Sequence, residues 1–121
     1  DQHGSVGRIC DRGHDWGGGT SLPQEVSTLD ELLFIARRET EPKFDEAFTS
    51  WHLYGADLCL QMQARGLPTF AIQAFVYHNS KNFTLDAKRY WPANIYFEKK
   101  WSRVMPVYTT VTERNSMGVK Q

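Results

Sequence analysis

The sequence predicts a single α/β domain in which a small mixed β-sheet is packed by helices. Three observations carry this prediction. An apolar stripe at helical spacing over residues 54–65 is followed, after a short turn, by an alternating apolar pattern over residues 69–78. A second helical pattern covers residues 85–105. The length of 121 residues suits one domain or part of one.

Composition and charge narrow the class of protein. Hydrophobic residues make up 40% and charged residues 23%, close to the averages of globular domains. Lysine plus arginine and aspartate plus glutamate both total 14, and the resulting zero net charge argues against a nucleic-acid partner. The longest apolar run, residues 32–36, is far shorter than the roughly 20 residues that cross a bilayer, so we expect no membrane span. No signal peptide opens the chain, and Cys10 and Cys59 have the spacing of free thiols, which predicts a cytoplasmic location.

Residues 1–24 are expected to form a Gly-rich loop or N-terminal extension, because glycines recur through them and fill positions 17–19. The segment lacks the Lys-Ser/Thr pair of a phosphate-binding loop, which makes it a weak phosphate cradle. As a surface loop it still carries His14, Asp15 and Trp16, side chains that can contact a ligand.

Residues 25–106 are expected to form the ordered body. Alternating apolar side chains over residues 32–38 predict an interior strand, which a charged turn containing Pro42 ends. Phe44 and Phe48 bracket a short turn, and we expect their rings to pin it to the body.

Residues 54–65 are expected to form the first helix. Gly66 suits the left-handed position that ends a helix, and Pro68 prevents its continuation. Apolar side chains at every second position then predict a strand over residues 69–78.

A second helix is expected over residues 85–105, with Thr84 as its N-cap. Pro92 lies inside it, so we expect a kink or two helices, the second opening at Pro92. The β-prone residues 107–111 begin a C-terminal tail, residues 107–121.

Two side chains are candidates for chemistry by their position. Asp57 lies in the first turn of the predicted helix beside Gly55, where a ligand can approach the backbone. His78 ends the predicted strand, at the edge where open α/β sheets bind ligands. In a shared crevice, Asp57 would act as a general base and His78 as a metal ligand. The plainer alternatives are that Asp57 only caps its helix and that His78 only hydrogen-bonds within a loop.

Several segments together resemble the C-terminal half of a family 2 glycosyltransferase of the GT-A, StrF-like type. In chain order they are 25–32 (EVSTLDEL), with Glu31 where the family has glycine, 44–48 (FDEAF), 52–60 (HLYGADLCL), 64–66 (ARG), 77–80 (YHNS) and 97–101 (FEKKW). The resemblance covers about residues 25–106, and the order and spacing of the segments are more specific than any one of them.

The resemblance implies inverting transfer of a sugar from a nucleotide-diphosphate donor, with Mn²⁺ or Mg²⁺ neutralising the leaving diphosphate. It implies that Asp57, or a neighbouring residue, is the catalytic base and that His78 is the metal ligand. The candidate acceptor-binding residues are Trp16, Tyr54 and Gly55. Many family members carry Glu-Asp where this chain has Tyr54 and Gly55, so Asp57 as a structural acid, with the base missing, is an alternative.

The sequence contains no Asp-x-Asp, the metal motif of that family's N-terminal half. We therefore expect a fragment or stand-alone half-domain that is inactive alone. The expected partners are the missing N-terminal half or a second copy, joined through an unpaired sheet edge or the aromatic late helix, and a nucleotide sugar or sugar acceptor. The alternative function is a non-catalytic, oligomeric binding module that retains only the fold.

Overall fold

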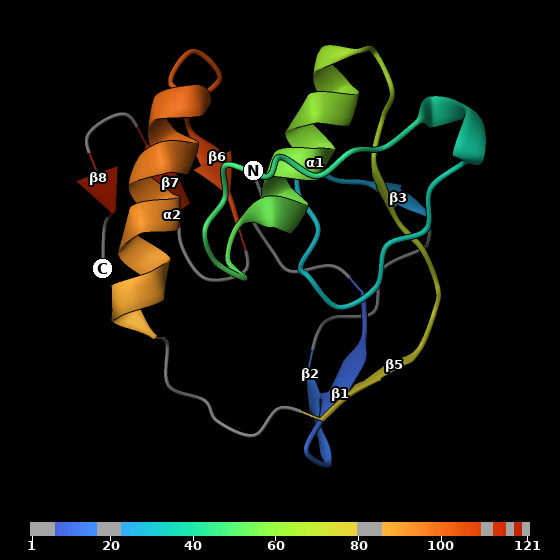
Figure 1. Ribbon diagram of the computed structural model, residues 1–121. Coiled ribbons are helices and arrows are strands. Elements are labelled where there is room, and N and C mark those ends of the chain that lie inside the picture. Colours follow the sequence, from blue (N-terminus) through green and yellow to red (C-terminus); the bar gives the residue numbers. More distant parts are fainter. Residues whose placement is uncertain (1–6, 17–22, 80–85, 110–112, 116–117, 120–121) are drawn as a thin grey trace.

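A computed structural model describes residues 7–16, 23–79, 86–109, 113–115 and 118–119. Within these ranges the chain forms two α-helices and three small β-sheets (Figure 1). One of the sheets mixes parallel and antiparallel pairs, so the predicted α/β class with a small mixed sheet is confirmed. Neither helix in these ranges has the length and apolar character needed to cross a membrane.

Helix α1 spans Tyr54–Ala64, as its apolar stripe predicts. Gly66 follows with a φ of 75°, a left-handed conformation that glycine adopts without a Cβ penalty. The Gly66 N–H donates to the Gln63 carbonyl at 2.9 Å, and the Leu67 N–H donates to the Met62 carbonyl at 3.0 Å. These two bonds form a Schellman motif, which confirms the predicted stop of the helix.

Helix α2 spans Ala87–Lys100 and runs through Pro92 as one helix, so the expected two-helix alternative is wrong. Pro92 removes one backbone hydrogen bond from the helix. The residues before and after Pro92 stay helical because one face of the helix is buried on both sides of it. Tyr90 and Ala93 are buried on that face, and Phe97 is fully buried. The predicted N-cap, Thr84, lies outside the described residues.

The two helices pack against each other and against strand β6 (Val107–Tyr108). The hydrophobic core consists of Leu53, Ala56, Leu60, Phe97 and Val107, with Phe48, Trp101 and Met105 packed against it. Strand β6 pairs with β7 (Glu113–Asn115), which pairs with β8 (Gly118–Val119), both antiparallel. The predicted β tendency after Pro106 is confirmed at Val107 and Tyr108.

The turn bracketed by Phe44 and Phe48 is pinned to this body as expected. The Phe48 ring lies edge-on to Tyr96 of α2, with 5.0 Å between ring centroids. The Phe44 ring lies edge-on to Tyr54 of α1 at 5.5 Å. The turn therefore contacts both helices.

The prediction of a loop over residues 1–24 is wrong in the described part. Strands β1 (Ile9–Asp11) and β2 (His14–Trp16) form an antiparallel hairpin. Its two-residue turn has Arg12 at φ 51° and Gly13 at φ 82°. Positive φ at both positions matches the right-handed twist of hairpin strands, and Gly13 supplies one of them without strain.

The predicted strand over residues 69–78 is divided between two sheets. Strand β4 (Phe70–Ala71) pairs antiparallel with β3 (Gln24–Glu25), whereas β5 (Val76–His78) pairs parallel with β1. A turn separates β4 from β5, where the Ala74 N–H donates to the Ile72 carbonyl at 2.9 Å. The N-terminal hairpin and β5 thus form one three-stranded sheet in the order β2-β1-β5.

The predicted strand over residues 32–38 does not form. The Leu32 N–H donates to the Asp30 carbonyl at 2.8 Å in a turn, and an irregular extended segment then leads to the short 3₁₀ helix η1 (Arg38–Thr40). Ile35 is 72% exposed, so alternation here does not reflect burial in a sheet. The expected sheet between this segment and the strand at Phe70 is absent from the described residues, and the helices pack on each other instead.

Candidate functional site

The N-terminal end of α1 is contacted by a carboxyl group from outside the helix. Glu31 Oε1 accepts a hydrogen bond from the Gly55 N–H at 3.3 Å. A Cβ added to Gly55 would lie 2.5 Å from Phe34 Cζ and 3.0 Å from Glu31 Cγ. The absence of a side chain at Gly55 therefore lets the segment with Glu31 and Phe34 pass this close to the helix.

The environment of Glu31 changes its acidity. Burial, as the largest cause, together with the neighbouring charge of Asp30, raises the pKa of Glu31 to about 7, against the opposing effect of the Gly55 hydrogen bond. A carboxyl group with this pKa is present near neutral pH in comparable amounts of acid and carboxylate. This is the condition in which a side chain both accepts and donates protons effectively.

Two titratable neighbours of Glu31 are kept in their protonated forms. Burial and the charge of Glu31 raise the pKa of the Tyr54 phenol. Burial raises the pKa of the Cys59 thiol, with a further contribution from Glu31. Because Cys59 is also only 2% exposed, it is a packed thiol rather than a nucleophile.

Leu53, immediately before α1, adopts the left-handed conformation with a φ of 67°. For a residue with a Cβ this costs on the order of 1–2 kcal/mol. Such strain persists only where the surrounding packing imposes it, and Leu53 is a buried member of the core. The strain lies at the same helix end as Glu31 and Gly55.

Asp57 is 1% exposed and joins α1 to α2. Its Oδ1 accepts a hydrogen bond from Trp101 Nε1 at 2.7 Å, and its Oδ2 accepts one from Gln61 Nε2 at 2.6 Å. Lys100 Nζ lies 2.7 Å from Oδ1. Both oxygens thus have partners inside the protein, an arrangement that favours the alternative of a structural acid.

Lys100 connects this buried carboxylate to a second one. Its Nζ also lies 2.6 Å from Asp45 Oδ2, which accepts a further bond from the Tyr96 hydroxyl at 2.8 Å. The hydrogen bond from Lys100, helped by those from the Ala47 N–H and Tyr96, lowers the pKa of Asp45 to about 2. The turn at Asp45 is therefore tied to α2 by charge and to both helices by its two phenylalanine rings.

His78 lies in a different part of the molecule from Asp57. It ends β5, and its Nδ1 is 3.6 Å from Oδ1 of the buried Asp11 in β1. Figure 1 shows β1, β2 and β5 at one end of the molecule, with α1 and α2 at the other. The structure does not bring Asp57 and His78 together in one crevice.

The predicted acceptor-binding residues fall into two groups. Tyr54 and Gly55 begin α1 and adjoin Glu31. Trp16 ends β2 and pairs with Ile9, so it belongs to the sheet that contains His78. Of the predicted site residues, only Tyr54 and Gly55 therefore share one site with Glu31.

Glu31 is not among the site residues predicted from the sequence. Glu31 and Gly55, at which the sequence departs from the pattern that it resembles, are in contact. Taken together, the two differences place the carboxyl group on the segment that contacts the helix instead of on the helix itself. That pairing is the signal from which the site was predictable.

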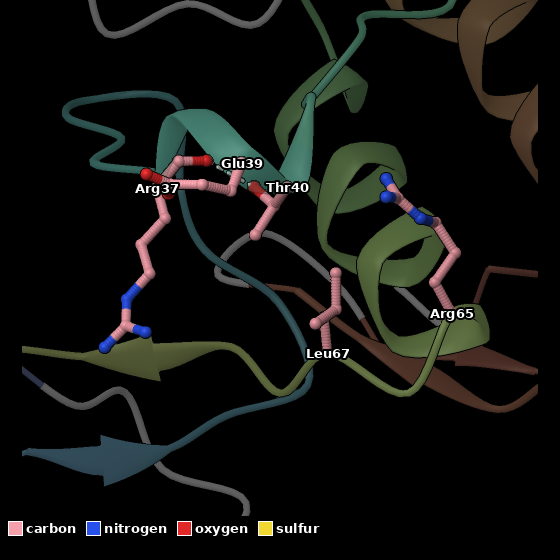
Figure 2. A pocket seen from close by; sticks show the side chains of 5 residues that line it. All are labelled: Arg37, Glu39, Thr40, Arg65 and Leu67. Atoms are coloured by element: carbon pink, nitrogen blue, oxygen red, sulfur yellow. Dashed lines mark hydrogen bonds between the residues drawn. The ribbon is translucent and has the colours of Figure 1, made fainter.

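The structure also has an open hollow of about 770 Å³ between η1 and the C-terminal end of α1 (Figure 2). Its lining residues are Arg37, Glu39, Thr40, Arg65 and Leu67. The Arg37 and Arg65 side chains extend in different directions in this view, and the Thr40 hydroxyl donates to the Arg37 carbonyl at 2.7 Å. The lining thus offers two separate cations rather than one convergent site.

In the described part of the chain, no three His, Cys, Asp or Glu side chains converge closely enough, as they stand, to hold a metal ion. His78 and Asp11 nevertheless supply a nitrogen and an oxygen donor side by side. Both donor types occur in protein metal sites, so this pair is chemically compatible with a divalent cation.

Comparison with known proteins gives one partial similarity. No model of a known protein family matches the sequence. Over 58 residues the chain is 34% identical to a protein of Fuscovulum blasticum described as "ATP synthase subunits region ORF 6". The aligned segment covers 48% of this chain and 23% of that protein, so the chain matches less than a quarter of its relative. The description refers to a genomic region and states no activity.

Proposed function

We propose that this chain is the acceptor side of a glycosyltransferase-like enzyme in which Glu31 takes the proton from the acceptor hydroxyl. The observation that carries the proposal is the Glu31 carboxyl group at the N-terminus of α1, beside Gly55 and with a pKa of about 7. The order and spacing of the segments that resemble the family support the reaction class.

The reaction then proceeds by displacement at the sugar. The acceptor oxygen forms a bond to the anomeric carbon as its O–H bond breaks, and the proton passes to a Glu31 oxygen. The bond from the anomeric carbon to the diphosphate breaks, and its electron pair leaves on the diphosphate. A divalent cation, when bound, neutralises the charge of that leaving group. Because the 121 residues hold no Asp-x-Asp, we expect a part outside them to bind the donor diphosphate.

The other predicted residues have supporting roles in this proposal. Tyr54 and Gly55 border Glu31 and would contact the acceptor. Asp57 acts as a positioning residue, because its bonds to Trp101 and Gln61 fix the helix that presents Gly55. His78 is not assigned the cation of the leaving diphosphate in this proposal, because β5, which it ends, lies at the other end of the molecule from the start of α1 (Figure 1).

Nuclear magnetic resonance of the ¹⁵N-labelled chain tests the proposal without the donor-binding part. A panel of mono- and disaccharide acceptors is titrated into the protein, with the Gly55 and Tyr54 amides as reporters. We expect at least one saccharide to shift both amides, and Glu31→Gln to weaken that binding several-fold. Glu39→Gln, at an exposed glutamate on η1, is the matched control and leaves the binding unchanged.

Three outcomes are informative. Saccharide binding at Gly55 that weakens as Glu31 changes protonation between pH 6 and 8 supports the catalytic role. Binding that is independent of pH and of Glu31→Gln favours the alternative, a non-catalytic binding module. Absence of any saccharide-induced shift at these amides contradicts an acceptor site at α1.

A further inference from the structure

The pairing of the three-stranded sheet brings three potential metal ligands into one row. Asp11 of β1 pairs with His14 across the hairpin and with His78 across the parallel pair. Directly paired residues on neighbouring strands point to the same face of a sheet, with Cβ atoms about 4.5–5.5 Å apart. The row His14, Asp11, His78 therefore crosses all three strands on one face.

The central carboxylate of this row is the least accessible of the three. Asp11 is 8% exposed, whereas the side chain of His78 is 46% exposed and His14 is exposed. The backbone also fixes the row, because the Arg12 N–H in the hairpin turn donates to the His78 carbonyl at 3.3 Å. A buried acid is thus flanked by two imidazoles that have room to turn toward it.

The separation of the donor atoms suits a shared ion. Nδ1 of His78 lies 3.6 Å from Oδ1 of Asp11, longer than the usual N–H···O hydrogen bond of about 2.7–3.2 Å. Two ligands of one tetrahedral zinc ion, each about 2.0–2.1 Å from the metal, are about 3.3 Å apart. A movement of a few tenths of an ångström by His78 would bring its Nδ1 and Asp11 Oδ1 to that separation. His14 is the residue paired with Asp11 on the other side.

We propose that His14, Asp11 and His78 bind a divalent transition metal of the zinc type, with a fourth coordination position open to water or a ligand. Two imidazoles and one carboxylate favour Zn²⁺ or Co²⁺, whereas Mg²⁺ prefers oxygen ligands. The inference goes beyond the proposed function, because metal binding to this row does not depend on sugar transfer or on Glu31.

The test is direct metal binding to the purified chain after treatment with a chelator. Calorimetric titration with Zn²⁺ should give one site per chain, and Co²⁺ should produce the visible absorption of a tetrahedral complex. His14→Ala and His78→Ala should each weaken Zn²⁺ binding at least tenfold. Asp15→Asn is the matched control, because Asp15 pairs with Cys10 and so lies on the opposite face of the same hairpin; its affinity should be unchanged.

Circular dichroism of the metal-free variants shows whether they remain folded, and the exposed His14 makes His14→Ala the decisive variant. Unchanged Zn²⁺ affinity in His14→Ala overturns the proposal, as does tighter binding of Mg²⁺ than of Zn²⁺, or no binding of either ion by the original chain. Zinc binding without any saccharide-induced shift at Gly55 would support this inference and contradict the proposed function. Saccharide-induced shifts without zinc binding would support the proposed function and contradict this inference.

Discussion

At the scale of single residues, Glu31 should make folding stability depend on pH. Its folded pKa of about 7 lies above its ordinary value of 4.5, so the folded protein holds this proton more tightly than the unfolded chain does. The resulting stabilisation is fully present below pH 4.5 and is lost as pH rises to about 7. We expect the free energy of unfolding to fall by about 3 kcal/mol from this group across that window.

Urea denaturation at a series of pH values between 4 and 8 measures this contribution. Because other groups titrate in the same range, the free energy of unfolding of the original chain is compared with that of Glu31→Gln at each pH. The free energy of unfolding of the original chain, relative to that of Glu31→Gln, should fall between pH 4.5 and 7 and stay constant above pH 7. The Glu39→Gln variant should follow the original chain, and parallel curves for all three proteins would contradict the raised pKa.

Gly55 should tolerate a side chain poorly, because the Phe34 ring occupies the space next to it. In Gly55→Ala the new Cβ would lie 2.5 Å from Phe34 Cζ, so the ring and its segment must move. Overpacking of this kind costs about 1–3 kcal/mol. In the background of Phe34→Ala the same substitution should cost much less, and a double-mutant cycle by urea denaturation measures the coupling. Additive effects of the two substitutions would show that the close approach is not what requires glycine.

At the scale of elements, Asp57 should be the main polar link between α1 and α2. Asp57→Ala leaves the Trp101 N–H without its carboxylate partner and leaves Lys100, whose side chain is 25% exposed, with Asp45 alone. Loss of the buried acceptor of these hydrogen bonds costs about 1–3 kcal/mol. Asp45→Ala removes the second, more exposed partner of Lys100 and should cost about 1 kcal/mol or less. Equal losses of unfolding free energy in the two variants would contradict the structural role assigned to Asp57.

The helices could be predicted from the sequence and most of the strands could not. Helix α1 satisfies its backbone hydrogen bonds within Tyr54–Ala64, and local signals such as Gly66 mark its end. The strands have two or three residues each, too few for an alternating pattern to establish, and the pairs β1 with β5 and β3 with β4 join segments far apart in the sequence. The hairpin escaped prediction because its Arg12-Gly13 turn lacks the Asn-Gly or Asp-Gly signature.

At the scale of the whole molecule, the candidate chemistry divides between two ends. The site at Glu31 depends on contacts between residues 24 positions apart in the sequence, and the row at His78 joins the N-terminal hairpin to β5. Motif spacing selected Asp57 and His78 because each lies at the end of an element. Spacing carries no information on which elements become neighbours, so it placed in one crevice two groups that the fold separates.

The surface of the whole molecule bears on the predicted self-association. In the described part of the chain, strand β5 is at the edge of its sheet; Tyr77 within it is 59% exposed, and Phe75 just before it is 66% exposed. Trp91 and Ile95 on α2 are 41% and 64% exposed and lie four residues apart, on one face of the helix. Both surfaces are apolar, but an edge strand also offers backbone N–H and carbonyl groups to a second chain.

We therefore expect association through β5 rather than through α2. Light scattering after size exclusion, at concentrations on the order of 10–100 µM, should show a dimer or larger species for the original chain. Phe75→Glu should shift it to a monomer, because a charge beside the open edge opposes strand pairing. Ile95→Glu introduces the same charge on α2 and should leave the oligomer intact. A monomeric original chain would contradict association altogether, and dissociation by Ile95→Glu alone would assign the interface to the helix.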